Sequence, residues 1–211
     1  THVQATQRDD SPLYIFDSMY DDHKRSCGIR EDYEVPPYFT DDLFQFVGEH
    51  RRPPYRWFLV GPARSGTTVH VDPLSTSAWN TLVYGRKRWV LFPPHFTKEF
   101  VKGRKHIRKA AGEDDESIDY FNNILPRIKE EGGPAVVSQI IEVTQRAGDT
   151  IFVPANWWHA VLNLDDTIAV TQNFCSTTNF AGVWEAVRAG RPGAQVAAHA
   201  AHRPPGPGGN C

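Results

Sequence analysis

Hydrophobic and polar residues alternate over much of the chain between residues 56 and 174, which is the pattern of strands with one buried face. Short segments of this kind are separated by turn residues such as Gly, Pro, Asn and Asp. The predicted strands are 56–60, 67–71, 86–92, 139–143, 150–153, 158–164 and 167–174. Several short strands with close turns predict a mainly β protein, built as a sandwich or a barrel.

The turns and the flanking segments add detail to this pattern. Ala147-Gly148-Asp149 and Asp165-Asp166 predict hairpin-like turns. Residues 13–16 predict an extended segment, and Thr40 predicts the N-cap of a helix with two aspartates in its first turn. The apolar face of that helix is expected to consist of Leu43, Phe44 and Val47. A second helix is expected after Asn179, with Phe180, Val183, Trp184 and Val187 on one face.

A charged segment interrupts the β pattern at about residues 98–137. The stretch 98–109 is strongly basic and the stretch 113–119 is acidic. Charge blocks of this kind are usually a solvated helix and loop, which is the first expectation. The alternative is a surface that recognises a charged partner.

Composition narrows the class of protein. The 211 residues contain 23 Lys and Arg against 25 Asp and Glu, so overall basicity gives no argument for nucleic-acid binding. The three cysteines are far apart and predict neither a disulfide framework nor a Cys-x-x-Cys metal site, which favours a reducing compartment. No segment predicts a membrane span or a secretory signal, and the chain is expected to be part of a longer protein.

The first candidate functional residues are His70 and Asp72, in the sequence His70-Val71-Asp72, together with His159, as possible metal ligands. In a strand, alternate residues face the same side, so His70 and Asp72 can point together into a barrel that His159 reaches from another strand. Two histidines and one carboxylate can form the facial triad of non-haem Fe(II) oxygenases, which leaves coordination sites open. The His-x-Asp pair by itself occurs by chance in many proteins.

Lys87 is the second candidate. Strand alternation puts it on one face with Trp89 and Leu91. If that face is buried, the ammonium needs an anion, which a dicarboxylate cosubstrate can supply. If the face is exposed, Lys87 is simply solvated.

Further polar and aromatic residues have two interpretations each. Thr171 can help to hold the same carboxylate or can be a good strand former. Asn80 can bond the cosubstrate or end a turn, and Asn163 can orient a ligand near His159. The aromatic residues that either line a pocket or pack in the core are Tyr14, Phe16, Trp79, Trp157 and Trp158.

These segments together resemble the jumonji-C family of 2-oxoglutarate oxygenases. The resemblance covers about residues 11–192 and rests on long matching strings. They are SPLYIFDSMY at 11–20, FTDDLFQFVGEHRRPPYRWF at 39–58, GPARSGTTVHVDPLSTSAWNTLVYGRKRW at 61–89, GDTIFVPANWWHAVLNLDDTIAVTQNF at 148–174 and WEAVRAGRP at 184–192.

The resemblance implies a double-stranded β-helix, the jelly-roll or cupin-like fold, with peripheral helices. It implies that Fe(II) is held by His70, Asp72 and His159, and that Lys87 binds the cosubstrate 2-oxoglutarate, with O2 as the second cosubstrate. The remaining contacts that it implies near the cosubstrate or the iron are Thr67, Asn80, Thr171, Asn163, Tyr14 and Phe16. The implied activity is lysyl hydroxylation, demethylation of N-methylarginine, or both, coupled to the formation of succinate and CO2.

The family also suggests a partner and a compartment. The expected substrate is a basic, Lys- and Arg-rich protein segment of an RNA-processing factor or a histone, in a nuclear or secondarily cytoplasmic protein. Binding of nucleic acid stays open, and the full-length protein is expected to form a homodimer. Residues 1–192 are expected to form the oxygenase domain without the N-terminal part found in the family, and 193–211 a disordered Ala/Pro/Gly-rich tail.

Two other classes of function remain open. One is a non-catalytic scaffold that keeps the fold and binds RNA-processing or chromatin proteins. The other is a metal-dependent cupin of a different reaction class, such as an isomerase, which has no evident need for a lysine and a threonine that clamp a carboxylate.

Overall fold

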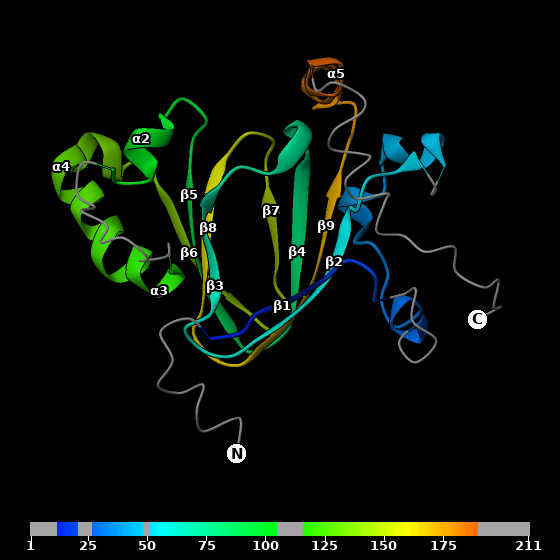
Figure 1. Ribbon diagram of the computed structural model, residues 1–211, viewed down its shortest axis with the longest axis horizontal. Helices are drawn as coiled ribbons and strands as arrows, with labels where there is room; N and C mark the ends of the chain where they lie inside the picture. The colour runs from blue at the N-terminus through cyan, green and yellow to red at the C-terminus, as the bar shows by residue number, and fades with distance from the viewer. Residues whose placement is uncertain (1–11, 21–26, 49–50, 105–115, 190–211) are drawn as a thin grey trace.

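A computed structural model describes residues 12–20, 27–48, 51–104 and 116–189, which form two antiparallel sheets that lie opposite each other (Figure 1). The five-stranded sheet has the order β1 (Ile15–Asp17), β2 (Arg56–Gly61), β9 (Thr167–Phe174), β4 (Ser77–Tyr84) and β7 (Thr150–Val153). The four-stranded sheet has the order β3 (Gly66–His70), β8 (Trp158–Asn163), β5 (Arg86–Phe92) and β6 (Ile141–Arg146). This arrangement confirms the predicted mainly β, jelly-roll fold.

All the predicted strands are present, with ends that differ by a few residues at most, but β4 was not predicted. It follows a Pro-Leu-Ser-Thr segment that has the composition of a turn, and its own residues do not alternate between apolar and polar. Ala78 faces the other sheet, whereas Trp79 packs in an apolar cluster on the outer face. Both faces of this part of β4 are buried, and the period-2 signal is therefore absent.

The turns predicted as hairpin-like connect strands of different sheets. Gly148 lies between β6 and β7, and Asp165-Asp166 lies between β8 and β9, yet neither pair of strands is hydrogen-bonded together. The chain reverses at Gly148, where φ is +90°, and the Asp149 amide donates to the Arg146 carbonyl. A tight turn specifies the reversal of the chain, but here the two strands separate and each pairs elsewhere.

The charged segment forms a helical layer over the outer face of the four-stranded sheet (Figure 1). Its described elements are α2 (Lys98–Val101), α3 (Ser117–Asp119), the π-helical turn η6 (Tyr120–Ile124) and α4 (Leu125–Val137). Apolar residues of this layer pack on the sheet, and the buried ones among them are Val101, Tyr120, Phe121, Ile124, Leu125 and Ile128. The described charged residues of this segment stay exposed or half-buried, whereas the apolar residues between and beyond them cover the sheet. Residues 105–115, which contain much of both charge blocks, lie outside the described residues.

Short 3-10 helices cover the outer face of the five-stranded sheet. They are η1 (Cys27–Arg30), η2 (Pro37–Phe39) and η3 (Leu43–Val47). Phe39 stacks on Trp79 with ring centroids 6.4 Å apart. The N-cap of η3 is Asp42, which accepts from the Phe44 amide, and not Thr40 as predicted, because the Thr40 hydroxyl donates back to the Pro37 carbonyl.

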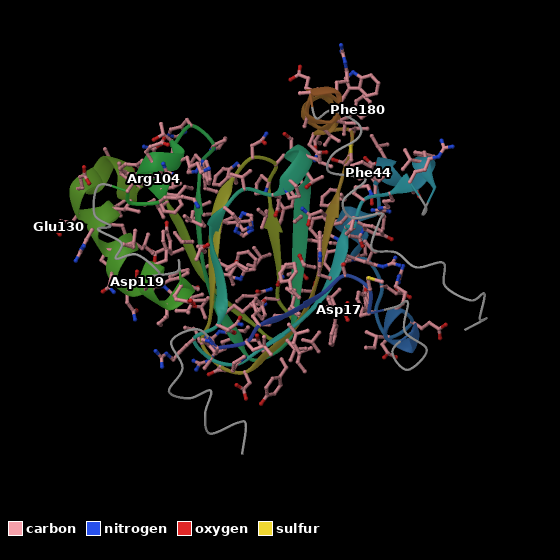
Figure 2. The ribbon with its side chains drawn as sticks, viewed as in Figure 1. Asp17, Phe44, Arg104, Asp119, Glu130 and Phe180 are labelled. Carbon is pink, nitrogen blue, oxygen red and sulfur yellow. The ribbon has the colours of Figure 1, made fainter. Side chains whose placement is uncertain are left out.

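The helix α5 (Phe180–Ala189) is present where it was predicted, at one end of the two sheets beside the turn η5 (Pro73–Ser75) (Figure 1). Of its predicted apolar face only Val183 is buried, whereas Phe180, Trp184 and Val187 are about half exposed. Figure 2 labels Phe180 on this helix. Among the described residues no helix combines the length and the apolar character needed to cross a membrane. The tail predicted to be disordered lies outside the described residues.

Candidate functional site

Two histidines face each other across neighbouring strands of the four-stranded sheet. His70 on β3 is paired with His159 on β8, and their ring centroids are 4.2 Å apart. Asp72 lies two residues beyond His70, at the start of η5, and not within the strand. Its Oδ1 is 3.9 Å from His70 Nε2 and 3.8 Å from His159 Nε2. The structure thus brings the three predicted metal ligands together, with one ligand atom from each within 4.8 Å of the others.

A β-bulge precedes His70. Thr67 is paired with Val161, and His70 with His159, so β3 has one more residue than β8 between these pairs. Val161 belongs to the apolar cluster between the sheets, which puts Thr67 on the inner face as well. Simple alternation would put Thr67 and His70 on opposite faces, because they are three residues apart. The bulge therefore places both residues on the inner face.

The backbone selects the tautomer of each histidine. His70 Nδ1 is 2.7 Å from the Thr68 carbonyl oxygen, and His159 Nδ1 is 3.1 Å from the Trp157 carbonyl oxygen. A carbonyl can only accept, so each Nδ1 carries the proton and each Nε2 keeps its lone pair directed at Asp72. Burial, and then the neighbouring His70, lower the pKa of His159 to about 3, which keeps that imidazole neutral. Neutral imidazoles held in this way are the ligands that divalent metals require.

One oxygen of the Asp72 carboxylate, Oδ2, is buried and has no hydrogen-bond partner among the described residues, and a bound cation would give it a partner. Burial raises the pKa of Asp72, while His70 and a hydrogen bond from Asn173 lower it. A divalent cation bound by both imidazoles and this carboxylate would neutralise the buried charge. The donor set of two nitrogens and one oxygen fits a first-row transition metal with open coordination sites.

Lys87 is fully buried, with 1% of its surface exposed. It lies on β5, opposite Asn163 of β8 and Gln145 of β6, and shares the inner face with Trp89 and Leu91. The predicted alternation is therefore confirmed, and this face is turned inward. Burial lowers the pKa of its amine to about 7. No ion pair among the described residues includes Lys87, so its charge has no protein counter-ion there.

Tyr14, which directly precedes β1, contacts Lys87 from the side of the other sheet. Lys87 Nζ donates to the Tyr14 hydroxyl at 3.1 Å. Gly61 on β2 makes room for the Tyr14 ring, because a Cβ at this position would overlap it. Burial raises the pKa of Tyr14, opposed in part by a hydrogen bond with Asn163, so the hydroxyl stays neutral. Phe16 is half exposed and packs against Trp57, with ring centroids 5.7 Å apart.

The other predicted contacts are buried amide and hydroxyl groups on the same inner faces. Thr171 of β9 is paired with Asn80 of β4, and its hydroxyl donates to the Trp79 carbonyl at 2.7 Å. Asn163 donates to the Ser65 hydroxyl at 2.8 Å. The side-chain carbonyl oxygens of Asn80 and Asn163 are buried without a protein partner in the described part of the chain. Asn80 lies in the middle of a strand, so the interpretation that it ends a turn was wrong. Side chains from both sheets project into the space between them (Figure 2).

Two of the tryptophans proposed as pocket residues lie elsewhere. Trp79 packs in the outer cluster of the five-stranded sheet, and Trp158 packs against the helical layer. Only Trp157 borders the cluster between the sheets. Core packing on the outer faces therefore accounts for the first two, because their strand positions alternate with inward-facing neighbours.

Sequence reasoning missed Gln145, which has no exposed surface. Its Oε1 accepts from Trp89 Nε1 at 2.8 Å, and its Nε2 donates to the carbonyls of Asn80 at 2.8 Å and Asp149 at 3.0 Å. The ring of Trp89 in turn stacks on the ring of His159, with centroids 6.2 Å apart and an angle of 26° between the ring planes. The predicted strand ended at residue 143, three residues before the end of β6, and so did not include Gln145. Asn173, which donates to Thr76 and Asp72, was missed because an asparagine in a strand is an unremarkable residue.

Comparison with known proteins identifies the family. The model of the JmjC domain, hydroxylase, matches residues 57–174. The chain is 47% identical over 185 residues to the bifunctional arginine demethylase and lysyl-hydroxylase psr-1 of Caenorhabditis elegans, covering 88% of this chain and 46% of that protein. It is 40% identical to the arginine-specific demethylase JMJ22 of Arabidopsis thaliana, over 84% of this chain and 34% of that protein. It is 33% identical to the human 2-oxoglutarate and iron-dependent oxygenase JMJD4, over 76% of this chain and 36% of that protein.

The chain thus spans about half the length, or less, of these relatives. Because the matched region covers more than half of the chain, the chain belongs to the JmjC domain family of hydroxylases.

Proposed function

We propose that this chain is the catalytic core of an Fe(II)- and 2-oxoglutarate-dependent oxygenase that acts on protein side chains. The observation that carries the proposal is the pairing of a possible His70, Asp72 and His159 metal centre with a buried lysine on the same inner face. Lys87 is paired with Asn163, which lies four residues from His159 on β8. At about 3.3 Å per residue, the backbones at Lys87 and at His159 are therefore about 13 Å apart along the sheet. The side chains of Lys87 and His159 both project into the interior, and a short dicarboxylate can reach both of them.

The residues have distinct roles in this proposal. His70, Asp72 and His159 hold Fe(II), and Lys87 pairs with the distal carboxylate of 2-oxoglutarate. Thr171 exchanges its hydrogen bond to the Trp79 carbonyl for one to that carboxylate. The further contacts proposed for the cosubstrate or its surroundings are Tyr14, Phe16, Thr67, Asn80 and Asn163.

When bound, Fe(II) together with 2-oxoglutarate and O2 supplies the oxidative chemistry, in which 2-oxoglutarate gives succinate and CO2 and one oxygen atom enters a substrate C–H bond. On a lysine side chain the product is hydroxylysine. On an N-methyl group the product loses formaldehyde, which is demethylation. The protein holds the ligands, provides an anion-binding lysine and keeps most water from the space between the sheets.

The proposed substrate is a basic segment of a protein, rich in Lys and Arg. The names of two relatives refer to arginine, and that of one also to lysine, as the residue acted on. An open pocket of about 460 Å³ is lined by His70 together with Thr67 and Glu116, among others. It connects one metal ligand with the surface and has an acidic residue on its wall, which favours a cationic substrate. An RNA-processing factor or a histone, and hence a nuclear location, is the proposed setting.

Homodimerisation of the full-length protein is a separate proposal. The support for it is the row of half-exposed apolar side chains on α5. Such a row on a short surface helix is commonly covered by a partner.

Mass spectrometry of Lys- and Arg-rich peptides, incubated with the chain, Fe(II), 2-oxoglutarate and ascorbate, tests the function. We expect one added oxygen on lysine or loss of a methyl group from arginine, together with succinate. Asp72→Ala is the matched control. Succinate formation that is absent in the wild type would favour a scaffold, and turnover of another substrate without 2-oxoglutarate would favour a different cupin reaction.

A further inference from the structure

The turn that follows Asp72 has an unusual backbone. Leu74 has φ 57° and ψ 24°, and the next residue, Ser75, has φ 53°. Neither residue is glycine, so in each of them the Cβ crowds the backbone in this left-handed conformation, which is sterically unfavourable. Two such residues in succession persist only where the surrounding structure holds them. The strained turn begins one residue after a metal ligand of the proposed site.

Hydrogen bonds from three directions hold this turn. The Thr76 amide and hydroxyl both donate to the Pro73 carbonyl, at 3.1 and 2.8 Å. Asn173 on β9 donates to the Thr76 hydroxyl at 2.9 Å. Asn179 Nδ2 lies 3.3 Å from the Ser75 carbonyl, 3.3 Å from the Phe174 carbonyl and 3.4 Å from the Ser77 hydroxyl, and so ties the turn to the ends of β9 and β4. All of these donors belong to residues that are buried.

Asn179 links the turn to α5. It directly precedes the helix, and the Val183 amide donates to its carbonyl at 3.1 Å. Its Oδ1 accepts from the Ser176 amide at 2.7 Å, which fixes the orientation of the side-chain amide. Gly182 lies over the turn, where an added Cβ would be 3.4 Å from Ser75 Cβ. The start of α5 therefore packs directly on the strained turn.

We infer that Asn179 is a positioning residue for the metal centre. It acts through the turn, because the φ and ψ values at Leu74 and Ser75 set the path of the chain between Asp72 and the Ser75 carbonyl that Asn179 contacts. With Asn179 in place, the carboxylate is held opposite both histidines at the same distance, within 0.1 Å. Without it, the turn relaxes toward ordinary backbone angles and the carboxylate loses its alignment. This inference rests on the proposed metal centre, and it makes α5 a structural support of that centre.

Mn²⁺ binding by the 211-residue chain, measured from the electron paramagnetic resonance signal of the free ion, tests this role without turnover. We expect Asn179→Ala to weaken Mn²⁺ binding by about tenfold, as is typical when a support of a metal ligand is removed. Leu74→Gly alone should change it by less than about twofold, because glycine adopts the positive φ without strain. In the double variant, Leu74→Gly should restore most of the affinity lost in Asn179→Ala, since a glycine turn no longer needs to be held.

Thr177→Ala is the matched control in the same loop, because the Thr177 hydroxyl bonds Asp41 and does not touch the turn. It should bind Mn²⁺ like the wild type. If Asn179→Ala lowered the melting temperature but bound Mn²⁺ normally, Asn179 would have a structural role only and the inference would be wrong. If Asn179→Ala failed to fold, Asn179→Ser, which is too short to reach the turn, replaces it in the same comparison. Failure of the metal centre itself is recognised separately, as equal Mn²⁺ binding by the wild type and Asp72→Ala.

Discussion

The ammonium nitrogen of Lys87 lies 3.1 Å from the hydroxyl oxygen of Tyr14, in the interior between the two sheets. Tyr14 directly precedes β1 of the five-stranded sheet, opposite the sheet that contains Lys87, and the centroid of its ring lies 5.7 Å from the ammonium. A neutral hydroxyl can accept a hydrogen bond but cannot neutralise a charge. Within the described residues Lys87 therefore has a contact but no counter-ion, and burial lowers the pKa of its amine, which suits it to bind an anion.

Binding of 2-oxoglutarate should be coupled to uptake of a proton. With a pKa of about 7, Lys87 is mostly neutral at pH 8, and a bound carboxylate raises that pKa. We therefore expect the affinity to fall as the pH rises above 7. Calorimetry of the Mn²⁺-loaded chain at pH 8, in buffers of different ionisation enthalpy, should report close to one proton taken up. The uptake should be absent in Lys87→Met, and equal uptake in both proteins would assign the proton to another group.

Loss of the Lys87 ammonium should weaken the use of 2-oxoglutarate. Lys87→Ala removes a charge-assisted hydrogen bond from a buried site, worth about 1.5–3 kcal/mol, so the KM for 2-oxoglutarate should rise by more than about tenfold. Lys87→Arg should restore only part of it, because the longer, forked guanidinium occupies the site differently. Steady-state succinate formation measures both. An unchanged KM in Lys87→Ala would mean that another residue binds the carboxylate.

Each proposed metal ligand should be required for turnover but not for the fold. His70→Ala, Asp72→Ala and His159→Ala each leave two ligands, which should weaken Fe(II) binding sharply and abolish succinate formation. Circular dichroism should stay close to that of the wild type. Normal succinate formation in Asp72→Ala would show that the cluster is not the metal centre.

The acidic stretch 113–119 should steer basic substrates. Only Glu116 and Asp119 of its acids belong to the described residues, and Glu116 lines the pocket that contains His70. Replacing the acids of this stretch by Asn and Gln should lower kcat/KM for a basic peptide by about two- to tenfold at low salt. The loss should shrink as salt is added, because exposed charges are screened beyond about 8–10 Å. Turnover of 2-oxoglutarate without peptide should not change, and an equal kcat/KM at low salt would remove the steering role.

Gln145 should stabilise the packing of the two sheets. Gln145→Leu leaves a buried indole N–H and two carbonyls without a side-chain partner, which should lower the free energy of unfolding by about 2–4 kcal/mol. Gln139→Leu is the control, because the Gln139 side chain is exposed and donates to the carbonyl of Ala135 in the preceding helix α4. It should change the stability by less than about 0.5 kcal/mol. Urea denaturation of both variants gives the comparison, and similar values would mean that the Gln145 bonds contribute little.

Local patterns in the sequence determined most of the strands and the face on which Lys87 lies. Alternation depends on the geometry of a single strand, so Lys87, Trp89 and Leu91 could be grouped before their surroundings were known. Alternation also grouped His70 with Asp72, but Asp72 lies beyond the end of β3, at the start of η5, so the turn and not the strand places its carboxylate. The long matching strings also implied the JmjC family, which the family model matched.

Only the tertiary structure decided which strands pair and what each face meets. A turn such as Gly148 reverses the chain in the same way whether its strands join one sheet or two. The bulge before His70 is a property of the pairing of β3 with β8, and it puts Thr67 on the inner face against the local pattern. Lys87 is buried because the opposite sheet covers it, and Leu74 keeps its strained φ because Asn179, far along the chain, holds the turn. These features depend on contacts between distant segments, which a period of two or four residues does not encode.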